Sequence, residues 1–168
     1  MSSDGPGADP DQTAAAGKRW FDAGNAAFRR GDVAGAVAAY ERAVQLSASH
    51  PDAWLNLGAA YRRTGRIEAA ADAARRALEL RPRDPMALNN LANALSAAGR
   101  LQEAARCYRQ ALEIRPADAE TWYNLVNLEP LNDGSAESDA LLSRLRGLAR
   151  EPGRYSARQR SALLFAFA

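Results

Sequence analysis

The chain has 168 residues, of which 47% are hydrophobic and 25% are charged, and these values suit a single folded domain of ordinary solubility. Its net charge at pH 7 is only +2, and arginines alternate with acidic residues, so the composition gives no reason to expect a nucleic-acid partner. The single cysteine, Cys107, excludes an internal disulfide and a thiolate-rich metal site.

Residues 1–16 combine glycine, proline, serine and acidic residues and lack the apolar side chains that would offset the entropy of ordering. We therefore predict a disordered N-terminal tail over 1–16. This segment has neither a basic start nor an apolar stretch, unlike a conventional secretory signal. No part of the chain approaches the roughly 20 apolar residues of a membrane span. We expect a cytoplasmic protein without a membrane partner.

From residue 17 onward the sequence repeats with a period of 34 residues. The frames are 17–50, 51–84 and 85–118, and a partial fourth unit follows at 119–128. Small residues recur at fixed places in the frames: Gly31, Gly65 and Gly99, and then Ala36, Ala70 and Ala104. Repetition at intervals of roughly 20 to 50 residues is typical of solenoids, in which one supersecondary unit is stacked many times.

Each unit predicts two amphipathic helices joined by a tight turn. In the frame 85–118, apolar residues are spaced three and four apart on both sides of Gly99. The glycine falls where a helix needs a left-handed residue after its C-terminus, and Pro82 and Pro116 stop the second helices. Such short pairs bury their apolar stripes only by stacking, so we predict an all-α helix-turn-helix solenoid. Large side chains should fill the space between layers: Trp20, Trp54, Leu88 and Trp122.

The pattern W-L-N-L-G-A-A-Y at 54–61, followed by Ala70, Ala77 and Pro82, resembles the tetratricopeptide repeat family. The resemblance covers roughly residues 17–128 and implies an αα superhelix that binds proteins or peptides. The sequence departs from the family pattern at Ala74, where a large aromatic residue is usual, and at Ala48, which replaces the closing proline.

The first unit is similar to the opening repeats of chaperone adaptors, which grip a C-terminal carboxylate with basic and asparagine side chains. Two asparagine places of that clamp are retained as Asn25 and Asn56. The basic places are occupied by Phe21, Met86 and Asn90, so the charge-assisted hydrogen bonds of a clamp are missing. We do not expect a working carboxylate clamp.

Asparagines recur along the first helices of the units and form two expected rows. Asn56, Asn90 and Asn124 make one row; Asn93 and Asn127 make the other, which Asn25 joins from the first unit. An asparagine side chain offers donors and an acceptor on one short arm, which suits the N–H and C=O groups of an extended peptide. Similar ladders occur in the repeat domains of O-linked N-acetylglucosamine transferases. The alternative is that asparagine is simply common at this place in the family.

Other side chains near the rows would favour a partly apolar ligand with acidic character. The candidates are Phe21, Tyr123 and Arg62. The aromatic positions could equally cover the packing between helices, and this alternative stays open.

Residues 129–168 are predicted to be divergent helices that cap or continue the solenoid, because Pro130 ends the first helix of the fourth unit early. The region 122–168 is similar to the segment that links tetratricopeptide repeats to a sulfotransferase domain in some bacterial proteins. Six arginines against one acid after Leu141 form a basic patch. A solvated helix face and a contact with phosphate or an acidic partner are both open explanations of the patch.

The sequence contains no pattern that supports catalysis. The only histidine, His50, precedes Pro51 at a unit junction and suits a capping or loop role, and no phosphate loop, metal-ligand spacing or nucleophile elbow occurs. We therefore predict a non-enzymatic protein-interaction scaffold with no catalytic residue, no cofactor and no metal. The alternative is a substrate-recognition part of a larger, sulfotransferase-like transferase. Nucleic-acid binding is less expected, and the sequence leaves the oligomeric state undetermined.

Overall fold

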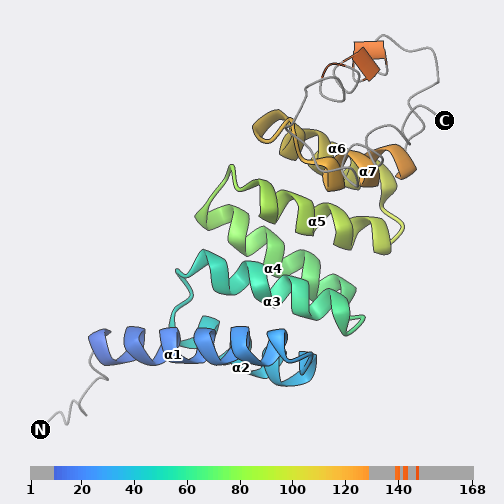
Figure 1. Ribbon diagram of the computed structural model, residues 1–168. Coiled ribbons are helices and arrows are strands. Elements are labelled where there is room, and N and C mark those ends of the chain that lie inside the picture. The colour runs from blue at the N-terminus through green and yellow to red at the C-terminus, as the bar shows by residue number, and fades with distance from the viewer. Residues whose placement is uncertain (1–9, 129–138, 141, 144–146, 148–168) are drawn as a thin grey trace, which may run out of the picture.

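The computed structural model describes residues 10–128 together with residues 139, 140, 142, 143 and 147 (Figure 1). Over residues 10–128 the chain is helical, without a strand, which confirms the predicted all-α class. The helices follow one another in the order α1 (Pro10–Arg29), α2 (Val33–Leu46), α3 (Pro51–Arg63), α4 (Ile67–Leu80), α5 (Pro85–Ala97), α6 (Leu101–Ile114) and α7 (Ala119–Leu128).

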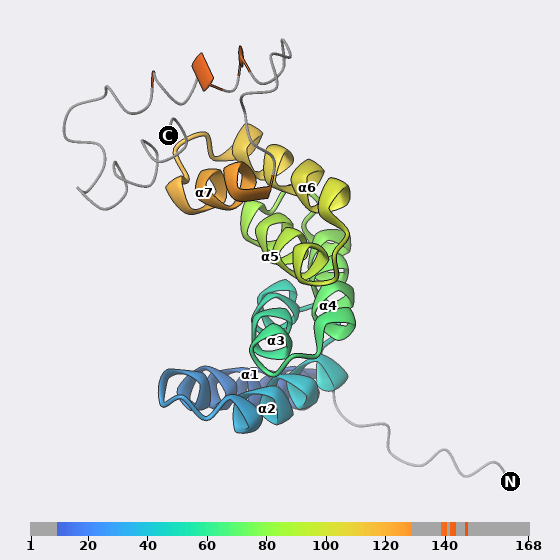
Figure 2. The same ribbon diagram turned by 90° about the vertical axis from the view of Figure 1, so that its right-hand side faces the viewer.

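The helices pack as successive pairs. Within the units α1 contacts α2, α3 contacts α4 and α5 contacts α6, while α2, α4 and α6 each contact the helix that opens the next unit. Figure 2 shows α3, α5 and α7 along the inner side of the curved stack and α4 and α6 along the outer side. The predicted αα superhelix is therefore confirmed, and side chains that project from the odd-numbered helices share one face.

The turn inside each pair has the left-handed glycine that the sequence predicts. The φ angles are 81° at Gly31, 75° at Gly65 and 76° at Gly99. The residue after each glycine donates its N–H back to a carbonyl near the end of the first helix: Asp32 to Ala27 at 3.0 Å, Arg66 to Tyr61 at 2.9 Å and Arg100 to Leu95 at 2.9 Å. These bonds satisfy carbonyls that the helix leaves unpaired, so the turn both ends the helix and fixes the next one beside it.

The junctions between units combine a cap with a proline. His50 Nδ1 accepts from the Ala53 N–H at 3.3 Å, and Asp84 Oδ1 accepts from the Met86 N–H at 2.9 Å. Pro51 and Pro85 follow directly as the first residues of α3 and α5, where the missing N–H is harmless. The capping role predicted for His50 is confirmed.

Small residues bring the helices of a unit close together. Ala36, Ala70 and Ala104 are almost completely buried. Gly24 also requires a small residue, because a Cβ atom there would lie 2.5 Å from the ring of Tyr40. Close approach at these points lets the large rings of Tyr40 and Tyr108 pass into the core.

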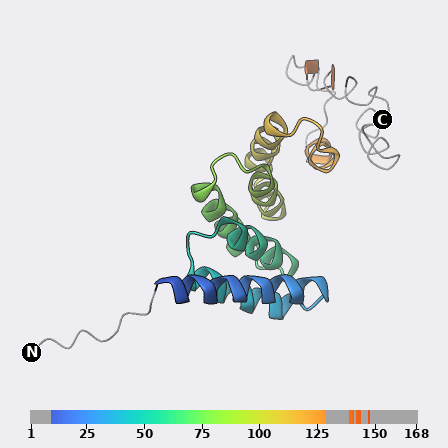
Figure 3. The same ribbon diagram turned by 60° about the vertical axis from the view of Figure 1, so that its left-hand side comes forward.

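The prediction that residues 1–16 form a disordered tail is wrong for residues 10–16. The helix α1 begins at Pro10, so residues 10–16 are helical; residues 1–9 lie outside the described residues. Three consecutive alanines at 14–16 favour helix without any large apolar side chain, and Asp11 in the first turn suits the positive end of the helix dipole. Figure 3 shows that the N-terminal end of α1 projects past the helices stacked on it.

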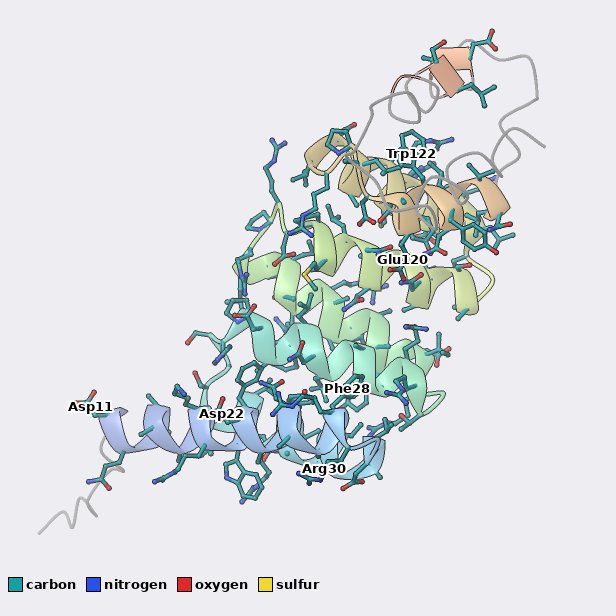
Figure 4. All side chains as sticks on the ribbon, in the orientation of Figure 1. Asp11, Asp22, Phe28, Arg30, Glu120 and Trp122 are labelled. Atoms are coloured by element: carbon teal, nitrogen blue, oxygen red, sulfur yellow. The ribbon has the colours of Figure 1, made fainter. Side chains whose placement is uncertain are left out.

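The three tryptophans are buried to different extents, and the expectation that Trp20 fills the space between helix layers is wrong. Trp122 is completely buried on α7 (Figure 4), and its Nε1 donates to the Pro116 carbonyl at 2.8 Å. Trp54 is half-buried and makes the equivalent bond to Ala48 at 2.8 Å. Trp20 is 43% exposed, because no unit precedes α1 in the described part of the chain.

The fourth unit contributes α7, Ala119–Leu128, to the described part of the chain. The expected divergent helices of 129–168 lie almost entirely outside the described residues. Among the helices described, none is long and apolar enough to cross a membrane.

Candidate functional site

The nine side chains predicted to bind a ligand all project from odd-numbered helices. They are Phe21 and Asn25 on α1, Asn56 and Arg62 on α3, Asn90 and Asn93 on α5, and Tyr123, Asn124 and Asn127 on α7. Asn25, Asn56, Asn90, Asn93 and Asn124 are half-buried, whereas Arg62, Tyr123 and Asn127 are exposed. Their placement on the inner helices makes a shared face available, and the hydrogen bonds decide how that face is organised.

Three side chains form a first amide cluster, Asn25, Tyr40 and Asn56. Asn25 Oδ1 accepts from the Tyr40 hydroxyl at 2.8 Å and from Asn56 Nδ2 at 2.9 Å. Tyr40 comes from α2 behind the face and is 1% exposed, so its hydroxyl is a fixed donor. The cluster therefore connects the two helices of the first unit to the first helix of the second.

The same arrangement recurs two units further along as the second amide cluster, Asn93, Tyr108 and Asn124. Asn93 Oδ1 accepts from the Tyr108 hydroxyl at 2.7 Å and from Asn124 Nδ2 at 3.3 Å. Tyr108 is 2% exposed on α6. Each member lies 68 residues after its counterpart in the first cluster, which is two periods of the repeat.

The central unit lacks this cluster. Ala59 and Ala74 occupy the places of the asparagine and the tyrosine, and Asn90 Nδ2 donates instead to the Leu55 carbonyl at 3.2 Å. Two parallel asparagine rows therefore give an incomplete description of the face. The hydrogen bonds cross between the rows and gather the amides into two separate clusters.

Each cluster leaves a defined set of polar groups for a ligand. The Asn25 oxygen is occupied by two donors, so its Nδ2 keeps both of its N–H groups. Asn56 keeps its oxygen, whereas its amide nitrogen donates to Asn25 and also interacts with the Tyr40 hydroxyl. A donor from one asparagine and an acceptor from its neighbour consequently lie side by side.

A hollow in the surface accompanies each cluster. The first hollow has a volume of about 140 Å³ and contains, besides the first cluster, Phe28, Arg29 and Ala59. The second hollow has a volume of about 560 Å³; besides the second cluster, its lining includes Arg62, Ile67, Ser96, Ala97, Tyr123, Asn127 and Leu128. The amide groups therefore reach the surface through concave sites.

Burial favours the protonated form of both tyrosine hydroxyls. Burial raises the pKa of Tyr40 above its ordinary value, against the opposing effects of Asn56 and of the Arg29 charge. Burial also raises the pKa of Tyr108 to about 12, and the Arg62 charge is the largest opposing influence. At neutral pH both phenols are donors, which fixes the orientation of the asparagine oxygens that accept from them.

The remaining predicted residues have individual surroundings. Phe21 is half-buried, with its ring centroid 4.6 Å from that of His50 and 6.0 Å from that of Tyr40, which agrees with the packing alternative. Asn127 donates to the Tyr123 carbonyl of its own helix at 2.8 Å. Tyr123 is 45% exposed at the second hollow.

The sequence interpretation missed the two tyrosines and Arg29. A signal for the tyrosines was available, because the asparagine at 25 and 93 and the tyrosine at 40 and 108 are present together and are both replaced by alanine in the central unit. Arg29 gave no such signal, since its place at the end of α1 resembles many exposed arginines in the chain.

Comparison with protein families identifies the repeats. One tetratricopeptide repeat model matches residues 21–85 and a second matches residues 85–118, so the two together span more than half of the chain. A comparison with curated proteins gave no match.

Solved structures similar to the chain agree with this result in fold. The tetratricopeptide domain of Arabidopsis OM64 has a TM-score of 0.67 at 22% identity, over 69% of this chain and 96% of that one. The first such domain of Spaghetti (RPAP3), bound to the HSP90 peptide SRMEEVD, has a TM-score of 0.67 at 23% identity, over 68% and 91%. An O-GlcNAc transferase mutant from Thermobaculum terrenum has a TM-score of 0.69 at 25% identity, over 89% of this chain and 27% of that one. The chain belongs to the tetratricopeptide repeat family.

Proposed function

We propose that this protein is a non-catalytic interaction scaffold that binds an extended peptide along its inner face. The observation that carries the proposal is the repeated amide cluster, in which a buried tyrosine orients one asparagine and that asparagine orients another. A side-chain network that serves packing alone has no need of free donors and acceptors opening into a hollow.

The clusters suit the main chain of a peptide rather than a particular side chain. A peptide unit offers one C=O and one N–H, and each cluster presents donors from its first asparagine beside an acceptor from its second. Because the tyrosine hydroxyl fixes the first amide, the ligand does not have to order it on binding, which reduces the entropic penalty. Two such amide clusters, separated by the central unit, would bind the main chain of an extended peptide at two places.

Similar domains support a peptide as the ligand. Spaghetti (RPAP3) is bound to the HSP90 peptide SRMEEVD, and the second tetratricopeptide domain of human RPAP3 is in complex with the HSP70 peptide SGPTIEEVD. This chain retains Asn25 and Asn56 but has Phe21, Met86 and Asn90 where a carboxylate clamp needs cations. We therefore propose an internal peptide segment, not a free C-terminus, as the ligand.

The proposal also covers the cellular location of the protein and the class of its ligand. The half-buried free cysteine, Cys107, suits the reducing cytoplasm that we propose as the location of this protein. The ligand is a protein or peptide; no nucleic acid, cofactor or metal is proposed.

A second candidate function is supported by the similarity to the Thermobaculum terrenum transferase, of which this chain covers 27%. Under this hypothesis the repeats recognise substrates for a transferase domain, and the proposed likeness of 122–168 to a sulfotransferase-linking region belongs here. Reading the genomic frame beyond Ala168 tests the idea. A transferase domain in that frame supports it, and a stop codon there with no transferase nearby removes it.

The scaffold proposal is tested with a phage-displayed library of ten-residue peptides selected on the full chain. The variant Asn56→Ala combined with Asn124→Ala removes the outer asparagine of each cluster, while Asn25 and Asn93 keep the bond from their tyrosines. Loss of about 1 kcal/mol at each cluster should weaken the selected peptides by roughly ten- to thirtyfold.

Gln110→Ala is the matched control, because this exposed amide on α6 lines neither hollow. Its affinity should stay close to that of the parent chain, and circular dichroism should show the same helicity for all variants. If the double variant captures the selected peptides as well as the parent chain does, the amide clusters are not the binding groups.

A further inference from the structure

Each hollow is bordered by an arginine that forms no ion pair with another described residue. Arg29 borders the first hollow and Arg62 borders the second, and both side chains are exposed. Within the described part of the chain neither forms an ion pair. Five other arginines each pair with a carboxylate: Arg66 with Glu41, Arg75 with Asp72, Arg76 with Glu79, Arg81 with Asp52 and Arg100 with Glu103.

The two guanidinium groups act on the polar groups of the clusters. The charge of Arg29 opposes the burial-induced rise in the pKa of Tyr40, and that of Arg62 does the same for Tyr108. Glu120 acts on Tyr108 in the opposite sense, with a weaker effect than Arg62. Each hollow therefore has a guanidinium group in its lining in addition to its amide donors.

We propose that the bound peptide carries two acidic side chains, one directed to Arg29 in the first hollow and one directed to Arg62 in the second. This inference rests on the proposed function and adds a ligand class to it. The amide clusters hold the main chain, whereas the two arginines select the side chains. Because the hollows occupy fixed places in the solenoid, the two acids are separated by a constant number of residues.

A carboxylate matches the chemistry of these hollows. A guanidinium presents parallel N–H groups to the two oxygens of a carboxylate, and the amide N–H groups add neutral donors beside it. Each hollow has one arginine in its lining, which balances the single charge of an aspartate or glutamate. A phosphate group carries about −1.5 to −2 charges near pH 7 and would be left undercompensated.

The central unit explains why two separate acids are expected instead of an acidic run. Between the hollows, Ala59 and Ala74 replace the asparagine and tyrosine, and Asn90 is engaged with the Leu55 carbonyl. The middle of the peptide thus meets no equivalent polar cluster. Its side chains there are free to vary, so the selected sequences should be conserved at the acids and variable between them.

The test uses the same ten-residue library, selected on the full chain and on the variants Arg29→Gln and Arg62→Gln. Selection on the parent chain should enrich Asp or Glu at two positions with constant spacing. Each variant should lose the enrichment at one position and keep it at the other. Loss of a charge-assisted hydrogen bond should weaken a selected peptide roughly tenfold per arginine.

The controls separate a specific contact from general attraction. Arg30→Gln removes a neighbouring exposed charge in the turn directly after α1 and should leave the enrichment unchanged (Figure 4). Arg29→Lys and Arg62→Lys should restore part of the affinity, since the charge returns without the paired N–H groups.

The outcomes distinguish this inference from the function on which it rests. Peptides that are captured through the asparagines without acidic enrichment overturn the inference and leave the scaffold proposal standing. Equal loss from Arg29→Gln and Arg30→Gln also overturns it, because the attraction is then unspecific. Failure to capture any peptide overturns both, and preferential capture of phosphorylated peptides overturns the assignment to carboxylates.

Discussion

Replacing Tyr108 by phenylalanine removes one hydroxyl group from the second amide cluster and leaves the buried ring in place. The lost bond joins the hydroxyl to Asn93 Oδ1 over 2.7 Å. A hydrogen bond between neutral side chains contributes about 0.5 to 1.5 kcal/mol to stability. Asn93 Oδ1 keeps the donor from Asn124 at 3.3 Å, so no buried acceptor is left without a partner. We expect the free energy of unfolding to fall by about 1 kcal/mol.

Denaturant unfolding of the full chain, followed by far-ultraviolet circular dichroism, measures this change. A double-mutant cycle with Asn93→Ala should return a coupling energy of about 1 kcal/mol for the pair. The matched cycle of Tyr108→Phe with Asn127→Ala should return a value near zero, because Asn127 bonds to the carbonyl of Tyr123 instead. A phenylalanine variant as stable as the parent chain, with no coupling to Asn93, would refute the view that the tyrosine orients the asparagine.

Three other predictions concern packing, pH and gain of binding. Trp122→Ala should lower the free energy of unfolding by about 3 to 5 kcal/mol because the side chain is completely buried. Trp20 is 43% exposed, so Trp20→Ala should lower the free energy of unfolding by about 1 kcal/mol or less in the same assay. Burial, helped by a hydrogen bond to a carboxylate, raises the pKa of Tyr61 from 10.0 to about 12. The folded state therefore binds this proton more tightly, and the free energy of unfolding should fall as the pH rises through this window. Tyr61→Phe should reduce this loss of stability, and an equal loss in both proteins would contradict the role given to Tyr61. Ala59→Asn should give the Asn90 amide a new acceptor and tighten peptide binding a few-fold in a titration, and unchanged or weaker binding would contradict this.

The sequence predicted the fold because each local signal had its own physical cause. The spacing of apolar residues defined the helices, and Gly31, Gly65 and Gly99 marked turns that need a positive φ angle. Repetition at a constant period then left stacking as the only way to bury the apolar stripes. The start of α1 was missed because alanine stabilises a helix without adding apolar side chains to a core.

The candidate site was predicted only in outline. Periodicity placed the asparagines on the inner helices, but it carries no information on which polar groups bond to one another. The bonds from Asn56 to Asn25 and from Asn124 to Asn93 connect neighbouring units, and their geometry depends on how the units are rotated against each other. Periodicity also could not show that Phe21 on α1 packs against His50, the residue that caps α3.

Side-chain amide signals in nuclear magnetic resonance spectra of the full chain test most directly whether the two amide clusters bind a peptide. On titration with a selected peptide, the NH₂ signals of Asn25, Asn56, Asn93 and Asn124 should shift together and saturate at one concentration. The signals of Gln45 and Gln110, exposed on α2 and α6, should stay in place. Saturable binding that moves the two glutamine signals and leaves the four asparagine signals unchanged would contradict the account.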